Sequence, residues 1–283
     1  MSKKFAIDWS SAKKAMVAQD SKKDYTDKRL YVPEFNKTGT SETVIRFLPS
    51  KDTEIPYAKV YNHSFNQNGK WYIENCHTTI NAGNKDIKCP ACDSNRDLWK
   101  SLTKDQQDER KRKLSFYGNI LIMKDPLHPE NNGKVFLFRY GVKIHEKIME
   151  RTSPPEGSII KAFNIHDWYE GLDFNLIIKK ITGKNGKPQN NYDSASFEGT
   201  PTAIGEDDVI EKICEKLYSI KEYYNPENFK PYDDCKKRFE AVIGTKQIAR
   251  ASDEENQPPS SGVVDDEKIE DTASVFAQID DED

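Results

Sequence analysis

The sequence lacks a long apolar run, and this absence narrows the classes of protein that it can encode. No stretch approaches the ~18 consecutive apolar residues that a membrane-spanning helix needs. The first residues, MSKKFAIDWSSAKKAMV, include lysines but no unbroken apolar segment like that of a secretory signal. We therefore expect a protein that is neither secreted nor inserted in a membrane. Its 283 residues suffice for one large domain or two modest ones.

Cysteine is scarce, and the five cysteines do not indicate a disulfide framework. Their number is odd, and three of them fall within the 30-residue segment HSFNQNGKWYIENCHTTINAGNKDIKCPAC, residues 63–92. Disulfides are rare in reducing compartments, where thiolates remain available for metal ions. The clustering therefore favours a reducing cell interior and a metal site.

Signatures of catalysis are also missing. We find no paired-carboxylate motif and no glycine-rich loop of the kind that cradles phosphates. Zinc-dependent deaminases need a glutamate two residues after the ligating histidine, whereas His63 is followed by Ser64 and Phe65. The sequence therefore predicts a protein that is not an enzyme.

Charge is distributed unevenly along the chain. Residues 251–283 hold twelve acidic residues and one lysine, a net charge of −11. The other 250 residues therefore carry 42 basic and 35 acidic side chains, a net charge of +7. A basic body with an acidic tail is typical of nucleic-acid binders whose tail competes for their own cationic surface. A merely solubilising disordered tail is the alternative.

Hydrophobic periodicity predicts a β-rich middle with helices behind it. Strand patterns occur at residues 43–50, 69–75, 113–125, 135–141 and 173–182. Helical patterns occur at residues 6–17, 93–112, 206–221 and 226–243, the last ended by Gly244. Asn132-Gly133 fits a turn between two strands. Such an arrangement is compatible with a small barrel.

Four side chains in the segment 63–92 have the composition of a zinc site. Cys89-Pro-Ala-Cys92 is the spacing with which one tight turn presents two thiolates to one ion. Cys76 and His63 complete a set of four N and S ligands, the number that closes a structural site. His77 competes with His63 or Cys76, although neighbouring residues of a strand point to opposite faces.

Small buried thiols without a metal are the alternative reading of these cysteines. The polar Asn, Lys and Asp residues around them argue against it. Cys214 and Cys235 lie on expected helices, and we predict no site for them.

Basic and aromatic residues occur together in RKRKLSFY, residues 110–117. Proteins that hold single strands without sequence preference combine cations along the phosphates with aromatic rings on which bases stack. In a strand, Phe116 and Tyr117 point to opposite faces, and Tyr117 is the better candidate for stacking. Phe138, Trp99 and Tyr192 are further aromatic candidates for which packing is the alternative role.

Several segments, in the same order, resemble the replicative single-stranded-DNA-binding (helix-destabilising) proteins of T-even-type bacteriophages. The matching segments are VIRFLPSK (44–51), NGKWYIE (68–74), the His-Cys-Cys-x2-Cys set, KRK-x-S (111–115), NIL (119–121), KDP with PEN and GKVF (124–136), and NYD-x-x-x-F (191–197). The resemblance covers most of the chain.

This resemblance implies an α+β fold, with an oligonucleotide-binding (OB) core and a zinc-binding subdomain near residues 60–110. The implied core is a five-stranded Greek-key barrel followed by C-terminal helices. It implies one structural zinc ion on His63, Cys76, Cys89 and Cys92, with His77 left outside. It also implies a DNA-binding set, namely Lys111, Arg112, Lys113, Phe116, Tyr117, Phe138, Arg139, Tyr192 and Trp99.

The resemblance further divides the chain into an N-terminal arm (1–25), a DNA-binding core (26–248) and an acidic tail (249–283). The arm, with Lys3 and Lys4, is expected to mediate cooperative head-to-tail self-association, and the tail to bind phage replication and recombination proteins. This chain departs from the family in a longer Cys76–Cys89 spacing and in an arm without the usual basic run.

The expected function is to coat single-stranded DNA without sequence preference in phage replication, recombination and repair. The expected location is the cytoplasm of the infected bacterium. The rival interpretations are a zinc-dependent nucleic-acid enzyme, such as a nuclease or deaminase, and a zinc-ribbon transcription or assembly factor.

Overall fold

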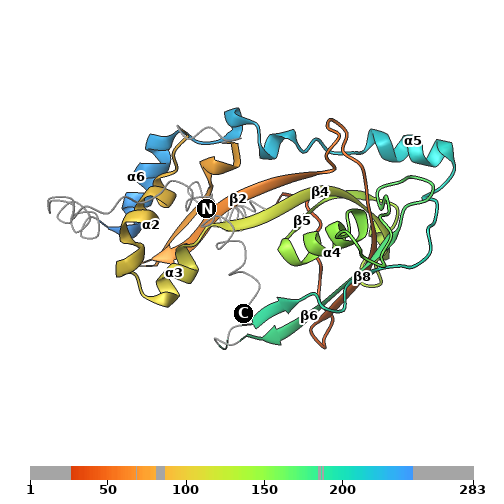
Figure 1. Ribbon diagram of the computed structural model, residues 1–283, viewed down its shortest axis with the longest axis horizontal. Helices are drawn as coiled ribbons and strands as arrows, with labels where there is room; N and C mark the ends of the chain where they lie inside the picture. Colours follow the sequence, from red (N-terminus) through yellow and green to blue (C-terminus); the bar gives the residue numbers. More distant parts are fainter. Residues whose placement is uncertain (1–26, 68, 81–86, 184–185, 187, 245–283) are drawn as a thin grey trace, which may run out of the picture.

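A computed structural model describes residues 27–67, 69–80, 87–183, 186 and 188–244. Within these residues, eight strands form one antiparallel sheet, and the helices lie around it (Figure 1). The strands are β1 (Thr40–Phe47), β2 (Tyr57–Gln67), β3 (Lys70–Asn75), β4 (Lys113–Lys124), β5 (Val135–Tyr140), β6 (Asp173–Thr182), β7 (Pro188–Asn191) and β8 (Ser196–Phe197). The α-helices are α2 (Pro90–Leu98), α3 (Lys104–Arg110), α4 (Val142–Thr152), α5 (Asp207–Glu215) and α6 (Tyr232–Ile243). The α+β class is confirmed, and the helix expected at residues 6–17 lies outside the described part.

Strand β4 holds the sheet together. Its first half pairs with β2 and its second half with β1, while β5 runs along the opposite edge. The switch between the two partners falls at Gly118, where a Cβ atom would lie 3.1 Å from the carbonyl oxygen of Pro56. The sheet order is β3-β2-β4-β1-β6-β7, with β5 on β4 and β8 on β6. The curled half-barrel that results is compatible with an OB-like fold.

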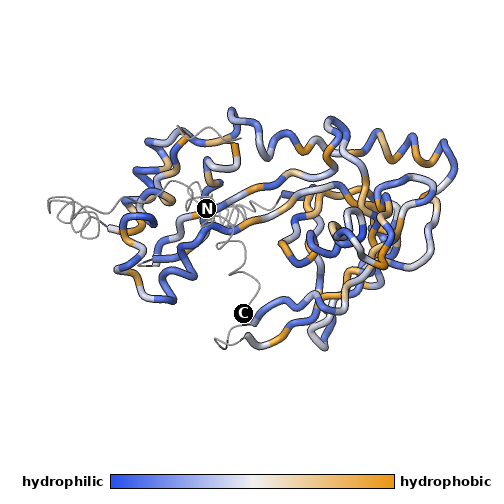
Figure 2. Tube along the Cα trace, in the orientation of Figure 1, coloured by the Kyte–Doolittle hydropathy of each residue, from blue (hydrophilic) through white to orange (hydrophobic). Residues whose placement is uncertain are grey.

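The main core lies between the curled sheet and helix α4. Ile144 and Ile148 are four residues apart and therefore share one face of α4, which they bury. They pack in one cluster with Ile120, Ile122 and Phe174. The apolar stretches of β4, β5 and β6 converge there in Figure 2. This burial supplies the main stabilisation of the barrel-like part.

A second core joins the segment with the candidate metal ligands to helix α6. It consists of Phe65, Tyr72, Cys76, Cys89, Ala91, Phe239, Val242 and Ile243. Figure 1 shows α6 beside α2 at the far end of β2 and β3. Glu74 of β3 forms ion pairs with both Lys230 and Arg238, which fasten α6 to the strand. The sequence did not predict that residues from beyond 230 complete this subdomain.

The helix expected at 93–112 is divided into α2, η2 (Trp99–Ser101) and α3, and two other expected helices are shorter than their hydrophobic patterns. The helix expected at 206–221 ends at Glu215, because Tyr218 pairs instead with strand β4. The Asn119 side chain donates to the Tyr218 carbonyl (2.9 Å) and accepts from its N–H (2.9 Å). The helix expected at 226–243 begins at Tyr232, since Pro231 fits the start of a helix but not its interior. No helix in the described part of the chain is long and apolar enough to cross a membrane.

Candidate metal centre and nucleic-acid interface

Two local structures bring the four candidate metal ligands together. His63 lies in β2, and Cys76 follows the paired strand β3, where its N–H donates to the Tyr61 carbonyl (2.8 Å). Cys89 is the N-cap of α2 and Cys92 lies in its first turn. A β-hairpin and a helix N-terminus therefore each present two ligands to one point.

The distances between the ligand atoms fit a single metal ion. The four atoms all lie within 4.8 Å of one another, and three of the four residues are buried. Cys92 Sγ is 3.3 Å from His63 Nε2 and 3.5 Å from Cys76 Sγ. A zinc tetrahedron with bonds of about 2.3 Å to sulfur has edges of about 3.8 Å. The described residues thus form a closed set of one histidine and three cysteines, and the predicted ligands are those that the structure brings together.

The pKa shifts of the clustered cysteines also favour the binding of a cation. Hydrogen bonds from Cys76 and Cys92 lower the pKa of the Cys89 thiol, whereas hydrogen bonds with Cys76 and Cys89 raise the pKa of Cys92. Three sulfur atoms in contact cannot all ionise without a positive charge between them. A bound divalent cation would supply that charge and deprotonate all three.

Neighbouring groups orient His63. Its Nδ1 faces the Arg110 carbonyl at 3.4 Å, and the Asn95 side chain donates to the same carbonyl (2.8 Å). This arrangement turns Nε2 toward the cysteines, as expected for a metal-binding histidine. His77 Nε2 instead donates to the Lys230 carbonyl (2.7 Å), so His77 holds the segment before α6 and is not one of the four.

The two remaining cysteines lie elsewhere. Cys214 is in α5 and Cys235 in α6. Burial raises the pKa of both thiols, to about 11 for Cys235, which keeps them protonated. These two cysteines therefore serve as controls for substitutions of the three cysteines in the four-ligand cluster.

The basic run Lys111-Arg112-Lys113 connects α3 to β4, next to the metal cluster. Arg112 lies over the Tyr61 ring, with its guanidinium carbon 4.1 Å from the ring centre. It also donates to the Thr78 hydroxyl (2.9 Å), and Lys113 donates to the Ser64 carbonyl (3.0 Å). The three cations thus lie where the part of the chain with the candidate metal ligands meets the rest of the sheet.

Phe116 and Phe138 lie in the main core, where they are 2% and 3% exposed. Their faces of β4 and β5 turn toward α4, and the Phe116 ring stacks on His145 with ring centres 3.8 Å apart. Neither ring presents a face to a base in this structure, so the packing role that the sequence left open applies to both.

The other predicted aromatic residues are half-buried and lie apart. Tyr117 stacks on Tyr223 with ring centres 4.0 Å apart. Trp99 belongs to the turn between α2 and α3, whereas Tyr192 follows β7 and packs against the main core. Arg139 is exposed and donates to the Ser115 hydroxyl. The structure does not gather these residues into one cluster.

Sequence reasoning missed three residues with similar chemistry. Lys59 and Tyr61 lie on the same face of β2, with the Lys59 ammonium 5.4 Å from the Tyr61 ring centre. Trp71 of β3 is 57% exposed. The alternation in GKWYIEN, with buried Tyr72 beside Trp71, was the available signal for the exposed tryptophan.

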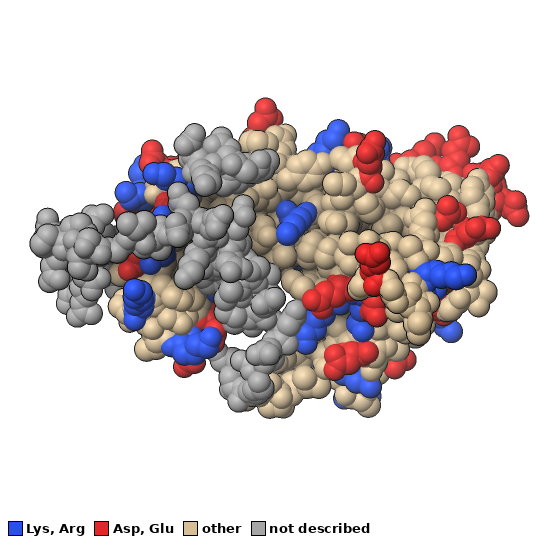
Figure 3. Space-filling view, in the orientation of Figure 1, with Lys and Arg blue, Asp and Glu red and all other residues tan. Residues whose placement is uncertain are grey.

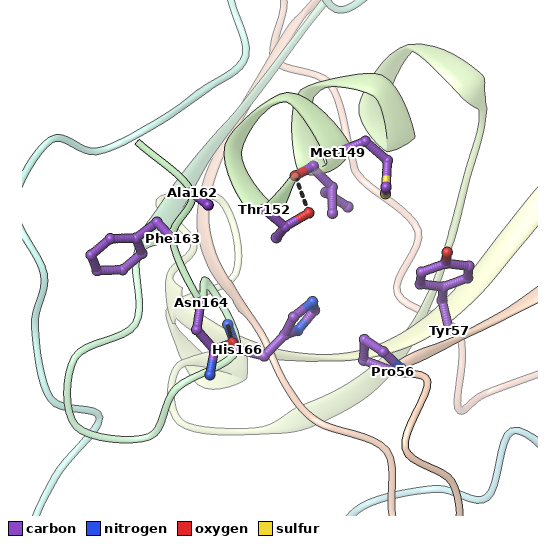
Figure 4. A pocket seen from close by; sticks show the side chains of 9 residues that line it. Pro56, Tyr57, Met149, Thr152, Ala162, Phe163, Asn164 and His166 are labelled. Carbon is purple, nitrogen blue, oxygen red and sulfur yellow. Dashed lines mark hydrogen bonds between the residues drawn. The ribbon is translucent and has the colours of Figure 1, made fainter. Parts of the chain in front are cut away.

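A hollow of about 420 Å³ lies beside the end of α4. Tyr57, Met149, Phe163 and His166 are among the side chains that surround it (Figure 4). Burial lowers the pKa of His166 to about 4, so the ring is neutral near pH 7. None of the predicted metal or DNA-contact residues lines this hollow.

Acidic side chains gather at the end of the molecule that is remote from the metal cluster. Figure 3 shows them over α5, whose first turn carries Asp207 and Asp208. Carboxylates near a helix N-terminus stabilise the helix. They would also repel a polyanion, which disfavours this end as a nucleic-acid contact.

Comparisons with known proteins point to one family. A family model described as "gp32 DNA binding protein like" matches residues 39–243, well over half of the chain. The single-stranded DNA-binding proteins of Enterobacteria phages T2 and T4 are each 34% identical over 231 residues, which cover 80% of this chain and 74% of each relative. The single-stranded DNA-binding protein of Enterobacteria phage RB70 is 43% identical over 94 residues, 32% of this chain and 77% of that relative.

Proposed function

The chain belongs to the gp32-like family of DNA-binding proteins, and from this premise we propose that it binds single-stranded DNA without sequence preference. In this proposal it coats and protects exposed strands cooperatively during phage DNA replication, recombination and repair. The observation that carries the proposal is the 34% identity, over 80% of the chain, to two proteins named as single-stranded DNA-binding proteins. The expected location is the cytoplasm of the infected bacterium.

The metal in this proposal is one structural zinc ion held by His63, Cys76, Cys89 and Cys92. The ligand set of one nitrogen and three sulfur atoms supports zinc, which prefers this composition in closed tetrahedral sites. With four protein ligands, no position remains open for a reactive water molecule. The ion would stabilise the subdomain near residues 60–110 without taking part in a reaction.

The DNA-binding core in this proposal spans residues 26–248 and is built on an OB barrel. The curled sheet around β1, β4 and β5 supports this assignment. Lys111, Arg112, Lys113 and Arg139 would neutralise phosphates, and Tyr117, Trp99 and Tyr192 would provide stacking surfaces. Tyr117 could accept a base only if the Tyr223 ring moved aside.

The two ends of the chain lie outside the described residues, and their roles rest on the sequence. Residues 1–25, with Lys3 and Lys4, would bind the neighbouring protein along the strand. Residues 249–283 would bind other replication and recombination proteins of the phage.

Salt-dependent binding tests the proposed function. If four cations each neutralise a phosphate, the affinity for a single-stranded homopolymer should fall about 50-fold between 50 and 200 mM salt. Fluorescence anisotropy with labelled homopolymers and a duplex of equal length measures this, with zinc content determined on the same sample. Equal or tighter binding to the duplex would instead favour a zinc-ribbon transcription or assembly factor.

Deletion of residues 251–283 should raise the affinity for single-stranded DNA roughly tenfold at low salt, because the tail carries a net charge of −11. Screening should erase most of the difference at 0.5 M salt. A chain of equal length, in which the twelve acidic residues of the tail are replaced by Asn and Gln, separates charge from bulk. Unchanged affinity in both variants would refute competition between the tail and DNA.

A further inference from the structure

Helix η1 (His77–Ile80) lies between the metal cluster and the basic run. The Thr78 hydroxyl is 3.0 Å from the sulfur of Cys76 and 2.9 Å from Nη1 of Arg112. One small side chain therefore contacts both a candidate metal ligand and a candidate DNA-binding cation. Neither contact was expected from the sequence.

We propose that Thr78 is a positioning residue that couples the metal centre to a DNA-binding cluster formed by Lys59, Tyr61 and Arg112. The proposal rests on the proposed function and extends it in two ways. It assigns Lys59 and Tyr61 to the DNA interface, and it gives the structural metal a route by which it would affect DNA binding.

The direction of the hydrogen bonds supports this coupling. A cysteine sulfur that ligates a metal is deprotonated and can only accept, so the single O–H of Thr78 must point toward Cys76. The oxygen lone pairs of Thr78 then face Arg112, whose guanidinium can only donate. With the metal bound, a series of hydrogen bonds would run from the Arg112 guanidinium through the Thr78 hydroxyl to the Cys76 thiolate, and each bond would polarise the next.

These hydrogen bonds hold the Arg112 side chain in a position suited to binding a nucleic-acid phosphate. Thr78 accepts from one guanidinium N–H, and the guanidinium carbon lies over the Tyr61 ring, 4.1 Å from its centre. Contact with the face of an aromatic ring holds the N–H donors of a guanidinium in one orientation, as recognition of a phosphate requires. Lys59 approaches the same ring and adds a second positive charge.

Tyr61 is in turn fixed by the metal-binding hairpin. Its carbonyl accepts from the Cys76 N–H (2.8 Å), and its own N–H donates to the Thr79 hydroxyl (2.9 Å). The same turn that presents Cys76 to the metal therefore also positions the ring beneath Arg112. Loss of the metal would loosen this turn, and with it the contact between Arg112 and Tyr61.

Four variants of the full, metal-loaded chain test the coupling: Thr78→Val, Thr78→Ser, Arg112→Gln and the double variant T78V/R112Q. Thr78→Val keeps the shape but removes the hydroxyl, whereas Thr78→Ser keeps the hydroxyl. Affinity for labelled oligo-dT is measured over a salt series, and zinc per chain is measured on each sample. The wild-type measurement tests the proposed function independently of the variants.

Thr78→Val should retain one zinc per chain and weaken DNA binding three- to tenfold, whereas Thr78→Ser should bind like the wild type. Arg112→Gln should weaken binding about tenfold and reduce the salt slope by about 0.7. In the Arg112→Gln background, Thr78→Val should have no further effect, because its only route to DNA has been removed.

Three results would overturn the coupling. They are wild-type affinity in Thr78→Val, an equal loss in both backgrounds, and a loss of zinc in Thr78→Val that accounts for its weaker binding. Absent or salt-insensitive binding by the wild type would refute the proposed function itself.

Discussion

Replacing Cys92 with serine is expected to release the metal and to lower the melting temperature by roughly 10 °C or more. The sulfur of Cys92 contacts both His63 Nε2 and Cys76 Sγ, so it lies within reach of the same ion as these two candidate ligands. Structural zinc contributes an apparent ~10–16 kcal/mol in small zinc-binding peptides. Part of the second core would remain, since Phe65, Tyr72 and Phe239 pack on one another without the metal.

Cys214→Ser is the matched control for this experiment. Cys214 is a half-buried cysteine of α5 that lies outside the ligand cluster. Calorimetry gives the melting temperature, and metal analysis gives the zinc content of both variants and the wild type. The control should retain one zinc per chain and melt within about 2 °C of the wild type.

Single-stranded DNA affinity should fall at least tenfold in Cys92→Ser, because Arg112 and Tyr61 would lose the turn that positions them. The chelated wild type should behave in the same way. A Cys92→Ser protein that keeps one tightly bound zinc and melts like the control would contradict a role of Cys92 as a ligand.

The grouping of the four candidate metal ligands was predictable because short-range spacing dictates much of their geometry. A Cys-Pro-Ala-Cys turn at a helix start presents two thiolates whatever the rest of the fold does. The strands β4, β5 and β6 were likewise visible, since their apolar residues alternate or run together. These features depend on residues that are close in the sequence.

Helix α4 and strand β2 are among the elements that escaped prediction, because their patterns are weak. Helix α4 buries only Ile144 and Ile148 among charged residues, and strand β2 carries Asn62 and Ser64 where a strand face would usually be apolar. Tertiary contacts decide such segments, since local propensity is a weak prior.

The surroundings of the candidate DNA-contact residues were harder still to predict. The alternation of side chains along a strand correctly placed Phe116 and Tyr117 on opposite faces. It could not show that Tyr223, more than 100 residues later, covers the Tyr117 ring. The Thr78 contacts depend on the same kind of long-range placement, because Arg112 is 34 positions away in the sequence. Sequence patterns reveal the chemistry of such a surface, whereas the fold determines which side chains share it.

The second large effect is expected at Arg46, which lies in β1 and is fully buried. Its guanidinium forms a salt bridge with Asp173 of β6 (2.7 Å) and donates to the carbonyl and hydroxyl of Thr202. Gly171 leaves room for the group, because a Cβ atom there would lie 2.6 Å from Nη1. Arg46 thus ties β1, β6 and the segment before α5 together.

Arg46→Ala should destabilise the protein by ~3–5 kcal/mol, since it leaves the Asp173 carboxylate without its buried partner. Arg96→Ala is the matched control: Arg96 pairs with Asp93 at 3.1 Å, but its side chain is 75% exposed. Solvent screens such a pair, and the control should change stability by no more than about 0.5 kcal/mol.

Urea unfolding measures the free energy of unfolding of both variants. The double variant Arg46→Met with Asp173→Leu separates the effect of charge from the effect of packing. Because it removes both charges and fills the space, the double variant should lose less stability than Arg46→Ala. DNA affinity, measured well below the unfolding midpoint, should stay near the wild-type value in the two variants at position 46, since the Arg46 side chain is fully buried and does not reach the surface to which a strand would bind. Equal destabilisation by Arg46→Ala and Arg96→Ala would show that burial does not set the strength of the Arg46 pair.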